Sequence, residues 1–193
     1  MSRPGVYLAL VHHPVKARDG ATITTSVTNL DVHDLARTGR TYGLRGYFVV
    51  TPVEAQQALV SHIVGHWRAG EGGQRVPERA EAMRLVQTAP SLEAVCQELQ
   101  RLEGAAPTVV TTAARGGRVA VCDFDTARAT LAAREAPVLL VFGTGHGLTD
   151  AMLASAHVHL APVRPGGYNH LPVRAAVAII LDRLFGDAGA DGP

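Results

Sequence analysis

Short apolar runs alternate with helical patterns along this chain, and that alternation limits the possible folds more than any other feature. Apolar residues recur with helical spacing at 32–42, 53–67, 92–102, 125–134 and 150–155. The candidate strands lie at 6–11, 47–51, 108–112, 137–142 and 157–162. Strands that alternate with helices form parallel sheets. The sequence therefore predicts an α/β fold, with a mostly parallel sheet and helices on both faces.

A glycine loop follows the run at 137–142. Gly143, Gly145 and Gly147 stand at alternate positions, before Thr149 and Asp150 as candidate helix caps. Glycines let a backbone approach a nucleotide or adenosyl group closely, and a tight turn without a ligand would need them as well. In dinucleotide-binding folds such a loop follows the first strand. This loop lies near the end of the chain, which indicates a different fold.

The last helical pattern, within 166–186, is apolar nearly all the way round, although Arg174 lies in its first turn. A helix that only covers a sheet has one apolar stripe and one polar face. We therefore expect this helix to be buried on nearly every side, either deep in one domain or between the sheet and a second subunit.

The length and composition predict one folded domain. The chain has 193 residues, of which 47% are hydrophobic, and a net charge of +1. We expect a single domain over 1–186 with a surface excursion around 68–104 and a flexible tail at 187–193. The near-zero charge argues weakly against nucleic-acid binding. No apolar run is long enough to span a membrane and no signal peptide is recognisable, so we expect a cytoplasmic protein.

Metal binding and a disulfide are not expected. His62 and His66 are four residues apart on a predicted helix, but no third ligand stands at a suitable spacing. Cys96 and Cys122 lie in apolar surroundings far apart in the sequence, which predicts two buried thiols. No Gly-x-Ser-x-Gly pattern supports a hydrolase.

Three segments in order resemble the SPOUT (α/β-knot) superfamily of S-adenosylmethionine-dependent RNA methyltransferases. The stretch "DVHDLARTGRTYGLRGYFVVTP" is similar to the first motif, with Arg37, Tyr42 and Gly43 matching. "FGTGHGL" resembles the second motif, and "NHLPVRAAVAIILDRL" the final one. The chain also resembles a bacterial subgroup of predicted RNA methyltransferases related to the tRNA guanine-N1 methyltransferase C-terminal fold. Residues 68–103 have no counterpart in the superfamily core.

The resemblance implies a C-terminal trefoil knot that binds S-adenosylmethionine between three loops. These loops follow "VVTTAARG", contain "FGTGHGL", or contain "LAPVRPGGYNHL". The implied cofactor-binding residues are Thr111, Thr112, Gly143, Gly145, His146, Gly147, Leu160, Tyr168, Asn169, His170 and Leu171.

The resemblance also implies a homodimer whose active sites use residues from both chains. Arg37 and Arg40 would approach the partner's cofactor, to hold RNA phosphate or stabilise developing charge, unless one of them pairs with a carboxylate such as Asp34. The family's first-motif asparagine falls on Asp31, and Asn29 lies two residues earlier. Asp31 is a candidate general base or a simple helix N-cap.

The expected function is methyl transfer from S-adenosylmethionine to RNA, either tRNA or rRNA, by a homodimer. The nucleotide and the methylated atom stay open. Two alternatives also stay open: an RNA-binding knot protein without catalysis, and a methyltransferase that acts on a small molecule. Arg174 either forms a salt bridge across the dimer or faces RNA.

Overall fold

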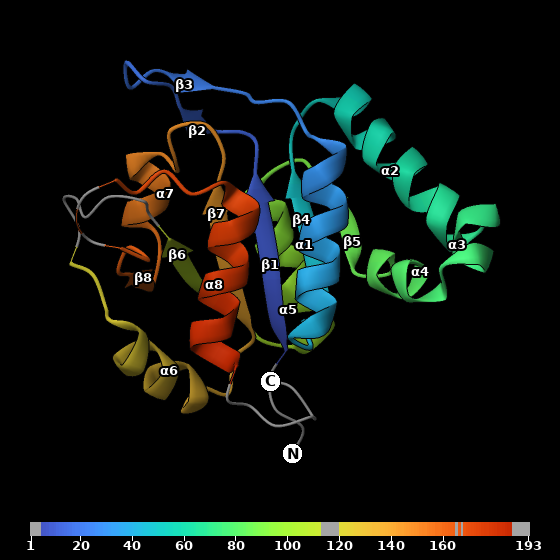
Figure 1. Cartoon of the computed structure of the whole chain (residues 1–193). Coiled ribbons are helices and arrows are strands. Elements are labelled where there is room, and N and C mark those ends of the chain that lie inside the picture. The colour runs from blue at the N-terminus through green and yellow to red at the C-terminus, as the bar shows by residue number, and fades with distance from the viewer. Residues whose placement is uncertain (1–4, 113–119, 165, 167, 187–193) are drawn as a thin grey trace.

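Six strands form one parallel sheet at the centre of the molecule (Figure 1). The computed structural model describes residues 5–112, 120–164, 166 and 168–186. The strand order is β5-β4-β1-β7-β6-β8, and every neighbouring pair is parallel. The strands are β1 (Val6–Val11), β4 (Gly46–Val50), β5 (Val86–Ala89), β6 (Thr108–Thr112), β7 (Val138–Gly143) and β8 (Val158–Leu160). Two further short strands, β2 (Val15–Lys16) and β3 (Thr22–Ile23), form an antiparallel hairpin.

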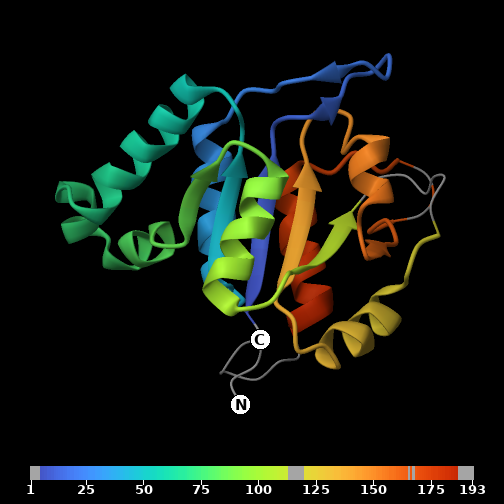
Figure 2. The same cartoon turned by 180° about the vertical axis from the view of Figure 1, so that it is seen from behind.

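Helices cover both faces of this sheet, as the sequence predicted. α1, α6 and α8 lie on one face, with α2 and α4 beside them at the β5 edge, and α5 and α7 lie on the other (Figures 1 and 2). The helices are α1 (Asn29–Thr41), α2 (Glu54–Arg68), α3 (Glu71–Arg75), α4 (Pro77–Met83), α5 (Leu92–Glu103), α6 (Phe124–Ala132), α7 (Asp150–Ala154) and α8 (Val173–Phe185).

The side chains of β1 show why both faces need cover. Leu8 and Leu10 belong to the core under α1 and α8, whereas Tyr7, Ala9 and Val11 belong to the core under α5 and α7. Successive side chains of a strand point to opposite faces, and all six residues of β1 are buried. An unbroken apolar run is therefore what a central parallel strand requires.

The region 68–104 differs from the expected surface excursion. It contributes β5, an edge strand of the sheet, and α5, whose Val95 and Leu99 are fully buried on the opposite face. Only Val86 and Ala89 of β5 are buried. An edge strand of four residues lacks the continuous apolar run by which the other strands were predicted.

α8 buries one side and leaves another half-exposed, so the prediction of nearly complete burial does not hold within one chain. Its buried residues, Val177, Ile180, Leu181 and Leu184, face the core. Ala175 and Ile179 are half-buried, and at 3.6 residues per turn they lie on the opposite side of the helix.

The remaining predictions concern the two cysteines, the C-terminal tail and membrane-spanning segments. Cys96 and Cys122 are free thiols but only half-buried. The predicted tail at 187–193 lies outside the described residues. Among the described helices, none is long and apolar enough to cross a membrane.

Candidate functional site

The three predicted cofactor loops leave the sheet at neighbouring strand ends. β6 lies between β7 and β8, and Thr112 pairs with Leu160 at the end of β8. Gly143 is the last residue of β7. The carboxyl edge of a parallel sheet is where α/β proteins bind ligands. The structure thus brings together four candidates that are distant in sequence: Thr111, Thr112, Gly143 and Leu160.

The side chains of these strand residues are mostly engaged within the sheet. Thr111 is 1% exposed, and its Oγ1 lies 2.7 Å from Nδ1 of His159. Leu160 is also 1% exposed. The side chains of Thr111 and Leu160 are therefore not available to a ligand, and these two residues could contact one only through backbone groups.

The glycine loop depends on missing side chains for its own conformation. Gly145 and Gly147 have φ angles of 59° and 105°, values that favour glycine. A Cβ at Gly143 would lie 2.7 Å from the backbone nitrogen of Leu148. A Cβ at Gly147 would meet no atom within 4 Å. There is therefore open space beside the α-carbon of Gly147, although its N–H donates to the Thr144 carbonyl at 3.0 Å.

The β2–β3 hairpin lies along this loop. The Lys16 N–H donates to the Gly147 carbonyl at 2.9 Å, and the His146 N–H donates to the Lys16 carbonyl, also at 2.9 Å. Lys16 Nζ lies 2.7 Å from a carboxylate oxygen of Asp150. Part of the glycine pattern is thus explained by contact with the chain itself.

This hairpin was not predicted from the sequence, because its strands have two residues each. The signal that could have found it is the Asp19–Gly20 pair between them. Asp-Gly is a strong hairpin turn signal, and Gly20 has a φ of 88°.

α1 begins at the same edge of the sheet. Thr28 is its N-cap, so Asp31 is not the cap that one alternative predicted. Thr28 Oγ1 accepts from the Asp31 N–H at 3.2 Å and donates to the Asp31 carboxylate at 2.6 Å. Asp31 is 8% exposed, whereas Asn29 is exposed in the first turn. Of the two, only Asn29 is freely accessible in a single chain.

α1 and α8 run parallel, side by side on one face (Figure 1). Arg174 Nη1 donates to Asp34 at 2.9 Å, and the Tyr42 hydroxyl donates to Asp182 at 3.1 Å. The two residues of each pair are 140 positions apart in the sequence. An equal separation in both pairs is what two parallel helices in fixed register require. The segment that precedes α8 therefore lies level with the start of α1.

Arg174 thus pairs within its own chain, an outcome that neither prediction for it described. It also approaches Asp31, at 3.8 Å. Before it, Tyr168 and Leu171 are 83% and 42% exposed, and the rings of Tyr168 and His170 lie 5.2 Å apart. His146 and His170 are exposed, and Asn169 is half-buried. These candidates form an accessible surface at the carboxyl edge.

Two buried polar residues, His12 and Tyr47, were not predicted from the sequence to be buried together. His12 and Tyr47 are both 0% exposed, and neither His12 Nε2 nor the Tyr47 hydroxyl has a hydrogen-bond partner in the described structure. Burial lowers the pKa of His12, although the nearby Asp31 carboxylate opposes this. Burial, and then Asp31, raise the pKa of Tyr47 well above its usual value.

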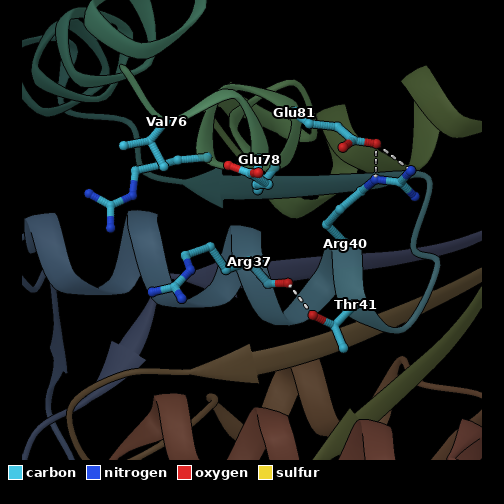
Figure 3. A pocket seen from close by; sticks show the side chains of 8 residues that line it. Arg37, Arg40, Thr41, Val76, Glu78 and Glu81 are labelled. Atoms are coloured by element: carbon cyan, nitrogen blue, oxygen red, sulfur yellow. Dashed lines mark hydrogen bonds and ion pairs between the residues drawn. The ribbon is translucent and has the colours of Figure 1, made fainter. Parts of the chain in front are cut away.

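Arg37 and Arg40 lie away from the glycine loop of their own chain, beside a pocket of about 580 Å³ between α1 and α4 (Figure 3). Arg40 Nε donates to Glu81 at 2.8 Å, in an ion pair. Arg40 thus pairs with a surface carboxylate, as one alternative predicted, but with Glu81, while Asp34 pairs with Arg174. Arg37 has no ion pair with any described residue, which leaves its guanidinium available for a ligand.

Metal ligands are not grouped in the described part of the chain. No three His, Cys, Asp or Glu side chains come close enough there to hold a metal ion. His66 instead packs edge-on against Trp67, with ring centroids 5.2 Å apart.

Comparison with known sequences gives one family. A family model described as SAM-dependent RNA methyltransferase matches residues 5–186. The tRNA (guanine-N(1)-)-methyltransferases of Oleidesulfovibrio alaskensis and Nitratidesulfovibrio vulgaris are 43% and 46% identical over 96% of this chain. The chain spans only 44% of the length of each. An uncharacterized protein of Aquifex aeolicus is 38% identical, over 96% of this chain and 90% of that protein.

Solved structures share the fold at low sequence identity. TrmJ from Z. mobilis matches with a TM-score of 0.60 at 16% identity, over all of this chain and 72% of that one. The SpoU methyltransferase AviRb from Streptomyces viridochromogenes, in complex with AdoMet, matches at 0.58 and 17% identity, over 95% and 58% of the two chains. At such identity these matches establish the fold alone.

Proposed function

The chain belongs to the SAM-dependent RNA methyltransferase family, and from that membership we propose that it transfers a methyl group from S-adenosylmethionine to RNA. The observation that carries the proposal is that β6, β7 and β8 end side by side at one edge of the sheet, where the three predicted cofactor loops begin; residues 113–119, 165 and 167 of these loops lie outside the described residues. Residues 1–186 would act as one methyltransferase domain.

The residues at this edge fit S-adenosylmethionine. Open space lies beside the α-carbon of Gly147, and backbone groups at the neighbouring strand ends would contact the adenine. When bound, the cofactor supplies an electrophilic methyl group to a nucleophilic atom of the substrate. The residues proposed to hold it are Thr111, Thr112, Gly143, Gly145, His146, Gly147, Leu160, Tyr168, Asn169, His170 and Leu171.

The chain's polar residues would position RNA and manage the proton. Arg37 is the better candidate to hold RNA phosphate or developing charge, because Arg40 is already paired with Glu81. Asp31 is the candidate base, since transfer to a nitrogen or hydroxyl releases a proton. Asp31 is nearly buried and lies near Arg174, so Asn29 is the more accessible polar group at the edge.

We further propose the C-terminal trefoil knot. β8 pairs with β6 on one side, while Cys122 forms a parallel bridge with Leu160 on the other. The Cys122 N–H donates to His159 at 2.7 Å, and the Ala161 N–H donates to Cys122 at 2.8 Å. Thr112 and Cys122 thus lie on opposite sides of β8. Pairing on both sides of β8 supports a knot in which the chain from β8 to α8 passes through the loop between β6 and Cys122. Residues 113–119 of that loop lie outside the described residues.

A homodimer would complete the site. Ala175 and Ile179 give α8 an apolar outer side, and the exposed Leu30 and Leu171 lie toward the start of α1 and α8. A second copy that covers this face would bring Arg37 toward its partner's cofactor loops. We expect Ile179→Glu to produce a monomer in analytical ultracentrifugation and to abolish methyl transfer, whereas a wild-type chain that sediments as a monomer would contradict the dimer.

The RNA species follows less directly. The relatives named tRNA (guanine-N(1)-)-methyltransferase are more than twice as long as the matched segment, so their named activity does not by itself belong to that segment. tRNA with guanine N1 as acceptor is nevertheless the first substrate to test, and rRNA the second.

Two measurements test the function. Calorimetry with S-adenosylmethionine should show saturable binding, and incubation of the protein with bulk tRNA or rRNA and labelled cofactor should transfer the methyl group. Mass spectrometry of the nucleosides would then identify the modified base or ribose. Absence of cofactor binding would contradict the proposal. Binding of cofactor and RNA without transfer would favour a non-catalytic RNA-binding protein, and transfer only to small molecules would favour the third alternative.

A further inference from the structure

The pocket between α1 and α4 contains more positive than negative charge that is free to act on a ligand. Three arginines line it, Arg37, Arg40 and Arg79, together with Glu78 and Glu81 (Figure 3). Arg40 and Glu81 form an ion pair and neutralise each other. Two guanidinium groups therefore remain against one carboxylate.

Arg79 is held in place without being neutralised. Its guanidinium carbon lies 4.6 Å from the centroid of the Trp67 ring, in a cation–π contact. Its Nε is buried and makes no hydrogen bond to the described residues. The Trp67 ring is itself fixed, because its N–H donates to His33 at 3.2 Å. Arg79 is thus a rigid donor with unused hydrogen-bonding capacity.

The lowered pKa of the nearby His33 is consistent with a positive electrostatic potential in this region. The pKa of His33 is lowered, first by burial and then by the charge of Arg79, with a smaller contribution from Arg37. Asp34 opposes this effect, and His66 adds to it. The charges of both arginines therefore act on the same part of α1.

We propose that this arginine pocket, defined by Arg37 and Arg79, binds a phosphate of the RNA substrate beside the nucleotide that is methylated. A guanidinium offers paired donors that match phosphate oxygens. The inference rests on the proposed function, which supplies RNA as the ligand. It gives the region 68–104, which supplies α4, a role in RNA recognition.

The location suits a strand of RNA that also reaches the carboxyl edge. Arg37 lies six residues after Asp31 on α1, a rise of about 9 Å at 1.5 Å per residue. In the proposed homodimer the partner's cofactor loops would lie near Asp31 and Arg37, so a nucleotide that reacts there can have a neighbouring phosphate in the pocket. Glu78 would oppose that phosphate by charge repulsion.

The test compares RNA binding of four variants across salt concentrations. Fluorescence anisotropy with a twelve-nucleotide oligo(U) and with bulk tRNA would give Kd for Arg37→Ala, Arg79→Gln, Glu78→Gln and the control Arg101→Ala. Arg101 lies on α5, on the opposite face of the sheet, and pairs with Glu98. Binding to phosphate depends steeply on salt, so the slope of log K against log salt counts phosphate contacts.

We expect Arg79→Gln and Arg37→Ala each to weaken RNA binding several-fold and to reduce the salt slope by up to about one. Glu78→Gln should tighten binding, and Arg101→Ala should match wild type. Retention of the wild-type affinity and slope by both pocket variants would overturn the inference. Inorganic phosphate should compete with RNA only at high concentration; tight binding of free phosphate that RNA does not displace would also overturn it.

The inference and the proposed function fail separately. Calorimetry of Arg79→Gln should give the wild-type affinity for S-adenosylmethionine, and its thermal midpoint shows whether it folds. If wild type binds neither cofactor nor RNA, the proposed function fails. If wild type binds both while the pocket variants bind RNA equally well, only the pocket inference fails.

Discussion

His12 Nδ1 lies 3.1 Å from Oγ1 of Thr25, and that hydroxyl also contacts the hydroxyl of Thr144 in the glycine loop. Polar contacts therefore join three segments: the residue that follows β1, the chain just after β3, and the glycine loop. His12 itself is fully buried, and its pKa is lowered by that burial against the opposing charge of Asp31.

This histidine should make stability depend on pH. In the unfolded chain its imidazole binds a proton near pH 6.5, whereas in the folded chain it resists protonation. The free energy of unfolding should therefore fall as pH drops below about 6.5, by at most about 1.4 kcal/mol per pH unit from this group. Urea unfolding at pH 7.5, 6.5 and 5.5 measures it.

Two histidine variants test this prediction, one of them as a control. His12→Gln should flatten the pH dependence, although His33, whose pKa is also lowered, should leave part of it. His62→Gln changes an exposed residue of α2 and should keep the wild-type profile. Identical profiles for wild type and His12→Gln would contradict the assignment.

The contact between Gly145 and the hairpin can be tested with a matched glycine. Gly145 and Gly20 both have positive φ angles, but a Cβ at Gly145 would lie 3.0 Å from the Lys16 carbonyl, whereas one at Gly20 meets nothing within 4 Å. Gly20→Ala should cost about 1–2 kcal/mol from backbone strain alone. Gly145→Ala should cost more and weaken S-adenosylmethionine binding, as thermal unfolding and calorimetry would show. Equal losses of stability would mean that the hairpin contact is unimportant.

The central strands could be predicted because parallel strands buried on both faces need continuous apolar runs, such as Val6–Val11. β5 was missed, since this edge strand has four residues and buries only its first and last, Val86 and Ala89, which leaves no continuous apolar run. The hairpin was missed as well, because its strands are short and its stabilising contacts come from the glycine loop, more than a hundred residues later. The three cofactor loops were grouped only by the family resemblance, and the parallel sheet explains why β6, β7 and β8 end side by side at one edge.

Individual side-chain roles were harder to predict. Which carboxylate pairs with Arg40 depends on how α4 packs against α1, and α4 lies in the region that matched no part of the superfamily core in the sequence. Arg174 pairs with Asp34 because α1 and α8 run parallel in a fixed register, which neither helix reveals alone. Burial of His12 and Tyr47 under α1 likewise follows from tertiary packing.

The link between α8 and α1 should be measurable as a coupling energy. Arg174 and Asp34 are partly exposed, with side-chain exposures of 32% and 42%, so a double-mutant cycle of Arg174→Ala and Asp34→Asn should give about 0.5–1 kcal/mol. Arg174→Ala alone should cost more than Asp34→Asn, because Arg174 also approaches the nearly buried Asp31. Urea denaturation provides the energies, and a coupling near zero would mean that packing alone joins the helices.

Two buried tyrosines should respond to the same substitution with opposite sign. The Tyr47 hydroxyl is buried without a partner among the described residues, whereas the Tyr7 hydroxyl donates to Glu103, and burial together with that carboxylate raises the Tyr7 pKa to about 12. Tyr7→Phe loses a hydrogen bond to a charged group and should cost about 1.5–3 kcal/mol. Tyr47→Phe removes an unsatisfied polar group and should leave stability unchanged or raise it by about 1 kcal/mol. Chemical denaturation of both variants decides the matter, and a loss of stability in Tyr47→Phe as large as that in Tyr7→Phe would show that the Tyr47 hydroxyl is hydrogen-bonded in solution.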